Sequence, residues 1–256
     1  MIHPQAVVDP GAELADGVQV GPFSVIGPGV NIDAGTVVGP HVVIEGPTRI
    51  GRDNRIHPFA SVGGAPQDRK YCDEPTELVI GDRNTIREGV TLNRGTVQDR
   101  GRTTLGNDNW IMAYVHIAHD CDVGSHTIFA NNASLAGHVR VEDHAILGGF
   151  TLVHQFCAIG ANAFTAFGSV IAKDVPPFMM VSGHPAHVHG LNSEGLKRRG
   201  LDSDSLRALK QAYRILYRSG LPLEAAQTRL ETEQGGDAQV RHLIDFLQRQ
   251  TRGIVR

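Results

Sequence analysis

Neither of the two common periods of secondary structure runs through the first three quarters of this 256-residue chain. Its apolar residues follow neither the repeat of an amphipathic helix nor the alternation of a half-buried strand. No apolar run approaches the ~20 residues of a membrane span, and the N-terminus, MIHPQAVVDP, lacks the basic and hydrophobic regions of a signal peptide. With 41% hydrophobic and 20% charged residues, the chain is expected to be soluble and cytoplasmic, with no membrane span.

A six-residue period is present instead. An aliphatic residue recurs at every sixth position from Ile2 to Val62 and, in a register shifted by one, from Leu105 to Ile171, with Thr165 as the one polar exception. This repeat is typical of a parallel β-helix, in which three hexads close one triangular coil. Residues eighteen apart should therefore stack, roughly 4.8 Å apart. Crossover connections are usually right-handed, so only the resemblance to known hexapeptide-repeat proteins implies that this β-helix is left-handed.

The sequence predicts two domains, an all-β solenoid over residues 1–190 and a C-terminal α-helical domain over 191–256. The solenoid strands should end near Pro176, where a cluster of Pro and Gly begins. Helical periodicity then predicts three helices. They are expected from Asp202 or Ser203 to Gly220, from Pro222 to Gly235, and from Val240 to Leu247.

Two segments interrupt the six-residue repeat, at residues 63–79 and 93–104. Insertions in repeat proteins leave the coil as surface loops, and loops on a rigid scaffold often carry function. The first insertion is polar and includes Asp68 and Lys70. A tolerated insertion without function is the alternative.

The three cysteines, Cys72, Cys121 and Cys157, leave at least one unpaired. Cys121 and Cys157 are thirty-six residues apart, so they should lie two coils, or roughly 9 to 10 Å, apart. That separation is too large for a disulfide. Both occupy the small position of their hexads, which favours buried packing over a role as nucleophile.

Charge is distributed unevenly along the chain, whose formal net charge is -3. Residues 193–256 contain 12 Lys or Arg and 8 Asp or Glu, a net of +4, which leaves a net of -7 for residues 1–192. An acidic partner would be attracted to the C-terminal domain. The alternative is that these positive charges are only the surface arginines that amphipathic helices commonly carry.

Three adjacent columns of the predicted prism collect polar residues within roughly 10 Å. They are His119, Gly137 and Gln155 in one column, Asp120 and His138 in the next, and His154 in the one before, with His116 near the same corner. A neutral imidazole can accept a proton from a hydroxyl, and a carboxylate can orient it. A glycine N–H can approach a developing oxyanion. The columns therefore contain the parts for acyl transfer without a covalent enzyme intermediate.

Five motifs resemble those of the UDP-N-acetylglucosamine O-acyltransferases that open lipid A synthesis in Gram-negative bacteria. They are PQDRKY at 66–71, HIAHDC at 116–121, LAGHV at 135–139, VHQFC at 153–157 and NSEGLKRRG at 192–200. The resemblance covers essentially the whole chain. It implies a homotrimer with active sites between subunits. It also implies transfer of a (3R)-3-hydroxyacyl group from acyl carrier protein to the glucosamine 3-hydroxyl of UDP-N-acetylglucosamine.

The resemblance also implies residue roles. His119 would be the general base, Asp120 would orient it, and the Gly137 N–H would bind the oxyanion. His138 and Gln155 would contact the sugar and acyl parts, His154 the acetamido region, and His116 would support the pocket. Substrate would further be bound by Asp68 and Lys70 of a neighbouring subunit, and nucleotide by Asn192, Glu194, Arg198 and Arg199.

Phe167 is the expected determinant of acyl-chain length, because several relatives have Gly at this position on the floor of the acyl groove. A phenyl ring there should shorten the groove and favour a chain of about ten carbons. A core aromatic residue at a corner is the alternative.

Other interpretations remain open. In a γ-type carbonic anhydrase on the same scaffold, three histidines bind a metal, and His116, His119 and His138 could do so. A non-catalytic scaffold is another possibility. The related N-acyltransferase carries an additional N-terminal domain, whereas the hexads here start at Ile2. We therefore expect an O-acyltransferase that uses no metal or cofactor and binds no nucleic acid.

Overall fold

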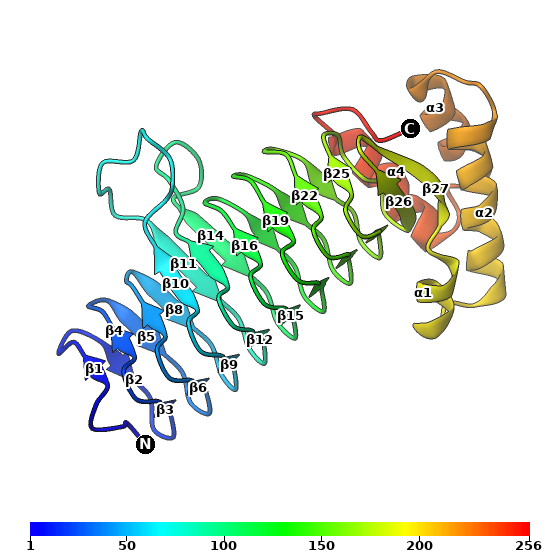
Figure 1. Cartoon of the computed structure of the whole chain (residues 1–256). Helices are drawn as coiled ribbons and strands as arrows, with labels where there is room; N and C mark the ends of the chain where they lie inside the picture. Colours follow the sequence, from blue (N-terminus) through cyan, green and yellow to red (C-terminus); the bar gives the residue numbers. More distant parts are fainter.

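Short strands wind into a triangular prism whose three faces are β-sheets (Figure 1). The structure is a computed structural model that describes residues 1–256. The first face consists of β1 (Val7–Val8), β4 (Val25–Ile26), β7 (Val43–Ile44), β10 (Ser61–Gly64), β13 (Thr91–Asn93), β16 (His116–Ile117), β19 (Ser134–Leu135), β22 (Leu152–Val153) and β25 (Val170–Ile171). The second face consists of β2 (Glu13–Leu14), β5 (Val30–Ile32), β8 (Thr48–Ile50), β11 (Glu77–Ile80), β14 (Arg102–Leu105), β17 (Asp122–Val123), β20 (Arg140–Val141) and β23 (Ala158–Ile159). The third face consists of β3 (Gln19–Val20), β6 (Val37–Val38), β9 (Arg55–Ile56), β12 (Thr85–Ile86), β15 (Trp110–Ile111), β18 (Ile128–Phe129), β21 (Ile146–Leu147), β24 (Phe164–Thr165), β26 (Met179–Gly183) and β27 (Ala186–Leu191).

The aliphatic residue of each hexad points into the prism, and the stacked hexads form one continuous core. Strand registers confirm the predicted eighteen-residue stacking, since His116 pairs with Ser134 and Ser134 with Leu152. Thr165, the polar member of the repeat, is fully buried. Its hydroxyl lies 2.7 Å from Thr151 Oγ1. The two hydroxyls satisfy each other, so the core tolerates them.

The chain turns at three corners of the prism, which we name first–second, second–third and third–first after the faces that they join. The residue three places after each aliphatic residue lies at a corner and often has a positive φ, for example 58° at Asp120, 64° at His138 and 66° at Phe156. Left-handed backbone is otherwise uncommon for such residues. Successive corners are hydrogen-bonded, as His138 N–H donates to His119 O over 3.0 Å. Side chains at a corner therefore stack along the outer edge of the prism.

Both insertions leave the prism at the first–second corner (Figure 1). They are shorter than the predicted 63–79 and 93–104, because β10 continues to Gly64, β11 begins at Glu77 and β14 begins at Arg102. Leu78 of β11 pairs with Thr103 of β14, and both residues are buried. These residues lie outside the hexad repeat, but their backbone groups still complete the second face. The loops are therefore residues 65–76 and 94–101.

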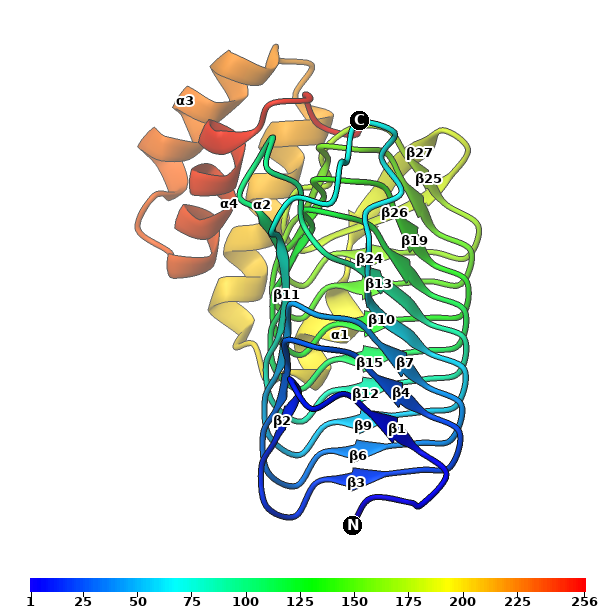
Figure 2. The ribbon, with the colours of Figure 1, turned by 90° about the vertical axis from the view of Figure 1, so that its left-hand side faces the viewer.

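The C-terminal domain is helical, with α1 (Ser193–Arg198), α2 (Ser203–Arg218), α3 (Leu223–Gln234) and α4 (Ala238–Arg249). Figure 2 shows α2, α3 and α4 beside the upper end of the prism. Asp202 caps α2 by accepting from the N–H groups of Asp204 and Ser205. An antiparallel pair, β26 and β27, precedes the helices and ends at Leu191. None of the helices is both long and apolar enough to cross a membrane.

Candidate active site

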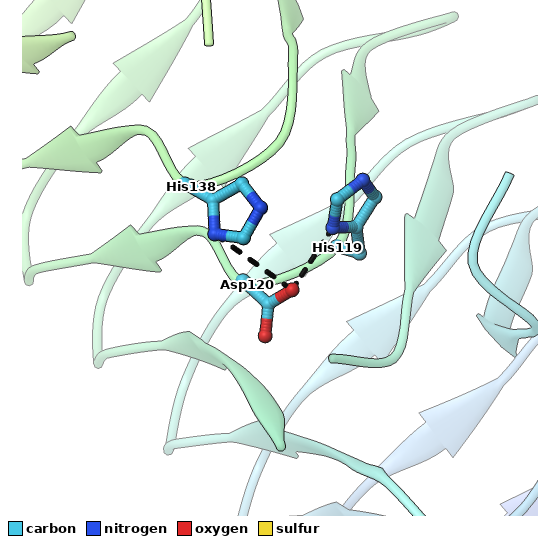
Figure 3. A group of neighbouring side chains, drawn as sticks. All are labelled: His119, Asp120 and His138. Atoms are coloured by element: carbon cyan, nitrogen blue, oxygen red, sulfur yellow. Dashed lines mark hydrogen bonds and ion pairs between the residues drawn. The ribbon is translucent and has the colours of Figure 1, made fainter. Parts of the chain in front are cut away.

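His119 and Asp120 follow β16 at the first–second corner and point toward each other (Figure 3). His119 Nδ1 lies 2.9 Å from Asp120 Oδ2. The His119 side chain is 15% exposed, whereas the Asp120 side chain is fully buried. A carboxylate can only accept, so this contact assigns the proton to Nδ1 and leaves a lone pair on Nε2. The imidazole can therefore take a proton from a hydroxyl at its exposed edge.

Asp120 is held in place from the second insertion. Thr96 donates its backbone N–H to Oδ1 over 2.9 Å and its hydroxyl to Oδ2 over 2.6 Å. Burial alone would raise the pKa of Asp120, but the hydrogen bonds from His119 and Thr96 outweigh burial and keep that pKa below its ordinary value. Asp120 is therefore an anion at neutral pH next to His119, which favours the imidazolium that proton transfer would create.

Gly137 lies one coil above His119, in direct contact with its ring. A Cβ at position 137 would lie 2.5 Å from His119 Cε1 and 2.7 Å from Nε2, so only glycine leaves room for the imidazole. The Gly137 backbone N–H donates to no acceptor within the chain. It is therefore free to bind an oxygen beside His119. The predicted column is present, while the role of each member stays a prediction.

His138 is the third member of the group in Figure 3. Its Nδ1 lies 2.7 Å from Asp99 Oδ2 and 3.9 Å from Asp120 Oδ2. Its ring stacks on Phe156, with 4.4 Å between ring centroids, and meets the His119 ring edge-on at 5.0 Å. The two imidazoles thus each have their own nearby carboxylate.

The other histidines of the predicted patch lie around this group. His116 is on β16, with its Nδ1 2.7 Å from Thr91 Oγ1. Burial, and then the nearby His119, lower the pKa of His116, so its ring stays neutral. Gln155 and His154 are exposed on the coil above Gly137. They leave the edge of the site open to a ligand.

The four predicted nucleotide residues lie elsewhere on the chain, in and around α1: Asn192, Glu194, Arg198 and Arg199. Asn192 caps α1 and donates its side-chain amide to Asn162 O over 3.0 Å, which places α1 at the second–third corner. Glu194 pairs with Lys197 over 3.0 Å. Within one chain, none of them contacts the His119 group.

Asp68 and Lys70 lie in the first insertion, and their only mutual hydrogen bond joins Lys70 N–H to Asp68 Oδ1 over 3.0 Å. Neither side chain forms a hydrogen bond or ion pair with His119 or Asp120. The two insertions do touch, because Arg94 Nη2 donates to Tyr71 OH over 3.1 Å.

Phe167 lies at the third–first corner, across the prism from His119. It is 75% exposed, and its ring meets that of Phe150 edge-on with 5.5 Å between centroids. This position contradicts the alternative of a core aromatic residue. A ring so exposed can line a surface groove.

Sequence reasoning missed three residues around the site: Thr96, Asp99 and Arg252. The first two lie in the second insertion, which has no repeat from which to predict contacts. Arg252 follows α4, and its Nη2 lies 3.4 Å from His154 Nδ1. The buried Asp174 holds this tail by accepting from Thr251 N–H over 3.3 Å. The only sequence feature that could have indicated contacts of Thr96 and Asp99 with the site is that the second insertion precedes HIAHDC by about one coil.

The residues do not match the metal site considered from the sequence. His119, Asp120 and His138 have potential ligand atoms within 4.8 Å of one another, but His116 is outside this group. The Nδ1 atoms of both His119 and His138 face carboxylates at hydrogen-bond distance and so carry protons. Nε2 of each ring keeps its lone pair, which can accept a proton. The three histidines that the metal alternative needs are not brought together, because His116 lies outside the group.

Comparison with known proteins agrees with this geometry. Residues 174–255 match the family model of UDP-N-acetylglucosamine O-acyltransferase, domain 2, and residues 102–137 match that of bacterial transferase hexapeptide repeats. The acyl-[acyl-carrier-protein]–UDP-N-acetylglucosamine O-acyltransferase of Thiobacillus denitrificans is 63% identical over 255 residues, which cover 100% of this chain and 99% of the relative. The enzyme of the same name from Halorhodospira halophila is 60% identical with the same coverage.

Solved structures extend the similarity to the whole fold. The UDP-N-acetylglucosamine O-acyltransferase of Moraxella catarrhalis is 46% identical, with a TM-score of 0.97 and coverage of 100% of this chain and 99% of that one. The acyltransferase of Francisella novicida is 42% identical, with a TM-score of 0.98 and coverage of 100% and 94%. The fold is the left-handed β-helix with C-terminal helices that the resemblance implied. This chain therefore belongs to the family of acyl-carrier-protein-dependent UDP-N-acetylglucosamine O-acyltransferases.

Proposed function

We propose that this protein is a cytoplasmic enzyme that catalyses the first step of lipid A synthesis. It transfers a (3R)-3-hydroxyacyl group from acyl carrier protein to the 3-hydroxyl of the glucosamine in UDP-N-acetylglucosamine. The single observation that carries this proposal is the contact of the His119 ring, hydrogen-bonded to Asp120, with the backbone of Gly137. A base and a free N–H donor lie within one coil of each other. Such an arrangement suits attack of a hydroxyl on a thioester.

In the proposed mechanism, His119 Nε2 removes the proton of the sugar 3-hydroxyl as its oxygen attacks the thioester carbon. A C–O bond forms, and the carbonyl oxygen becomes an anion that accepts from the Gly137 N–H. The intermediate then collapses, the C–S bond breaks, and the carrier thiolate leaves with the proton that His119 returns. Asp120 keeps its charge throughout and stabilises the imidazolium. No metal or cofactor takes part.

Substrate binding would involve the remaining residues. His138, Gln155 and His154 border the His119 group on the first–second corner, where sugar and acyl parts would bind, and His116 supports the pocket. The nucleotide residues at α1 would have to come from a neighbouring copy, to which the resemblance also assigns the Asp68–Lys70 pair. Charged Arg198 and Arg199 suit a pyrophosphate.

The distribution of exposed apolar side chains supports a homotrimer. They gather on the first face and at the third–first corner: Val7 61%, Val25 41%, Val43 39%, Phe23 52%, Phe59 66%, Tyr114 66% and Phe150 51% exposed. The second face instead presents charged residues such as Glu13, Arg49 and Asp122. A closed ring of three copies needs two different contact surfaces on each copy. The first and third faces, which flank the apolar third–first corner, supply these two surfaces. Packing of one copy's first face on the next copy's third face would bring a second–third corner toward His119.

Phe167 would set the acyl-chain length. A phenyl ring at the end of the groove would exclude chains longer than about ten carbons, because a clash costs more than the ~0.8 kcal/mol that each buried methylene contributes. Acyl carriers of ten to fourteen carbons should be assayed with the wild type and Phe167→Gly. The variant is expected to shift its preference toward fourteen carbons. An unchanged preference would contradict this role.

The proposed function is tested by incubating the protein with UDP-N-acetylglucosamine and 3-hydroxyacyl carrier protein and detecting the O-acylated sugar nucleotide by mass spectrometry. His119→Ala, checked for oligomeric state by light scattering, should lose activity by about 100-fold or more. A trimeric His119→Ala variant with full activity would refute His119 as base. Absence of product with the wild type would support a non-catalytic scaffold.

A further inference from the structure

The second insertion reaches back over the site that follows it in the sequence. Thr96 binds Asp120, and three residues later the Asp99 carboxylate lies 2.7 Å from His138 Nδ1. Asp99 is the more exposed partner, since its side chain is 38% exposed and that of His138 is 14% exposed. We propose that Asp99 is a positioning residue that holds His138 away from Asp120 and thereby reserves Asp120 for His119.

Competition for one oxygen atom is the basis of this inference. Asp120 Oδ2 lies 2.9 Å from His119 Nδ1 and 3.9 Å from His138 Nδ1. The second distance is about 1 Å longer than a hydrogen bond. A modest rotation of the His138 ring would close it. Because Oδ2 also accepts the Thr96 hydroxyl, a further donor would weaken the bond to His119.

The remaining contacts of His138 do not prevent that rotation. Phe156 stacks on one face of the ring at an interplanar angle of 13°, which still allows the ring to slide in its own plane. His119 meets it edge-on. Asp99 is the only group that engages Nδ1 at hydrogen-bond distance. It fixes the tautomer with the proton on Nδ1 and turns Nε2 toward the space in which the sugar nucleotide would bind.

This inference rests on the proposed function for its effect on rate, but its geometry can be tested without activity. Histidine-selective ¹⁵N NMR of the full chain reports the tautomer of each ring, and His138→Gln identifies the His138 signals. In the wild type, we expect His138 to be protonated on Nδ1 with a slowly exchanging proton. In Asp99→Ala, that signal should broaden or vanish and the His119 Nδ1 signal should move. Gln98→Ala, an exposed neighbour in the same loop without hydrogen bonds, is the control.

Asp99→Asn separates charge from geometry. Its amide oxygen can still accept from Nδ1–H, so the tautomer should persist while the Nδ1 proton resonance moves upfield, because the bond is no longer charge-assisted. This variant also serves if Asp99→Ala does not fold. We expect kcat to fall by about 10- to 100-fold in Asp99→Ala, less in Asp99→Asn, and not at all in Gln98→Ala.

Identical His138 and His119 spectra in wild type and Asp99→Ala would overturn the inference, whatever the activities. In Asp99→Asn, an unmoved Nδ1 resonance would do the same. Altered spectra in a protein without transferase activity would instead uphold the positioning by Asp99 and refute the proposed function.

Discussion

Gly137→Ala should inactivate the enzyme while leaving its fold intact. A Cβ at this position would lie 2.5 Å from His119 Cε1, 2.7 Å from Nε2 and 3.1 Å from Nδ1. Ordinary contact begins near 3.4 Å, so the ring must retreat by about 1 Å. Misplacing a reacting group by that distance costs about 100-fold in rate, or ~2.7 kcal/mol of barrier. Gly137 is not among the positive-φ residues, so alanine brings no backbone strain of its own.

The assay is kcat/KM for the acyl transfer of Gly137→Ala, together with its thermal midpoint. The midpoint should stay within about 2–4 °C of the wild type. Alanine keeps the backbone N–H, so the proposed oxyanion donor is retained. The double variant with His119→Ala isolates this effect, because a substitution that acts only through His119 adds nothing once the ring is absent.

Two results would refute the reasoning. A Gly137→Ala enzyme with wild-type kcat/KM would show that the ring does not need the space above Gly137. Losses that multiply in the double variant would show that alanine acts on the substrate independently of His119.

Three further outcomes can be measured. Asp120→Asn places an NH₂ group among buried donors, so it should lower kcat at least tenfold and cost about 1–3 kcal/mol of unfolding free energy in denaturant titrations. A variant with unchanged kcat would remove Asp120 from the mechanism. Hydrogen bonding to Glu142 raises the pKa of His242 above 6.5, so this contact between α4 and the β-helix is strongest below pH 6.5 and is lost as the pH rises through the raised pKa. The thermal midpoints of wild type and His242→Gln should therefore differ by at most about 2–4 °C at pH 6 and converge at pH 9. A difference in midpoint that grows with pH would contradict the pairing. Iodoacetamide at pH 8 should modify only the exposed Cys72, because burial raises the pKa of Cys121 to about 12 and of Cys157 to about 11; a second adduct in the native protein's mass spectrum would contradict that burial.

The sequence was sufficient where its repeat continues. Because every hexad adds one strand and every third hexad returns to the same face, subtraction alone put Gly137 above His119 and His138 above Asp120. The structure has both pairs in contact across adjacent coils. Likewise, the spacing of Cys121 and Cys157 excluded a disulfide between them, and their hexad position predicted burial; both are free and buried.

Prediction failed where the repeat stops. The contacts of Thr96 with Asp120 and of Asp99 with His138 come from a loop whose path no period describes. The bounds of both insertions were also too wide, because strand pairing continues beyond the hexad pattern at Leu78 and Thr103. The six residues of α1 were not predicted as a helix, since so short a segment has little periodicity.

The sequence by itself determined the prism, its columns and the placement of His119 beside Gly137, because a β-helix converts spacing along the chain directly into position in space. Only the tertiary structure decided how Asp120 stays charged in a buried position, which carboxylate each imidazole uses, and where the C-terminal tail meets His154. Those features depend on contacts between segments of unrelated sequence, and the free energy of such contacts is set by distance and burial, not by any pattern within one segment.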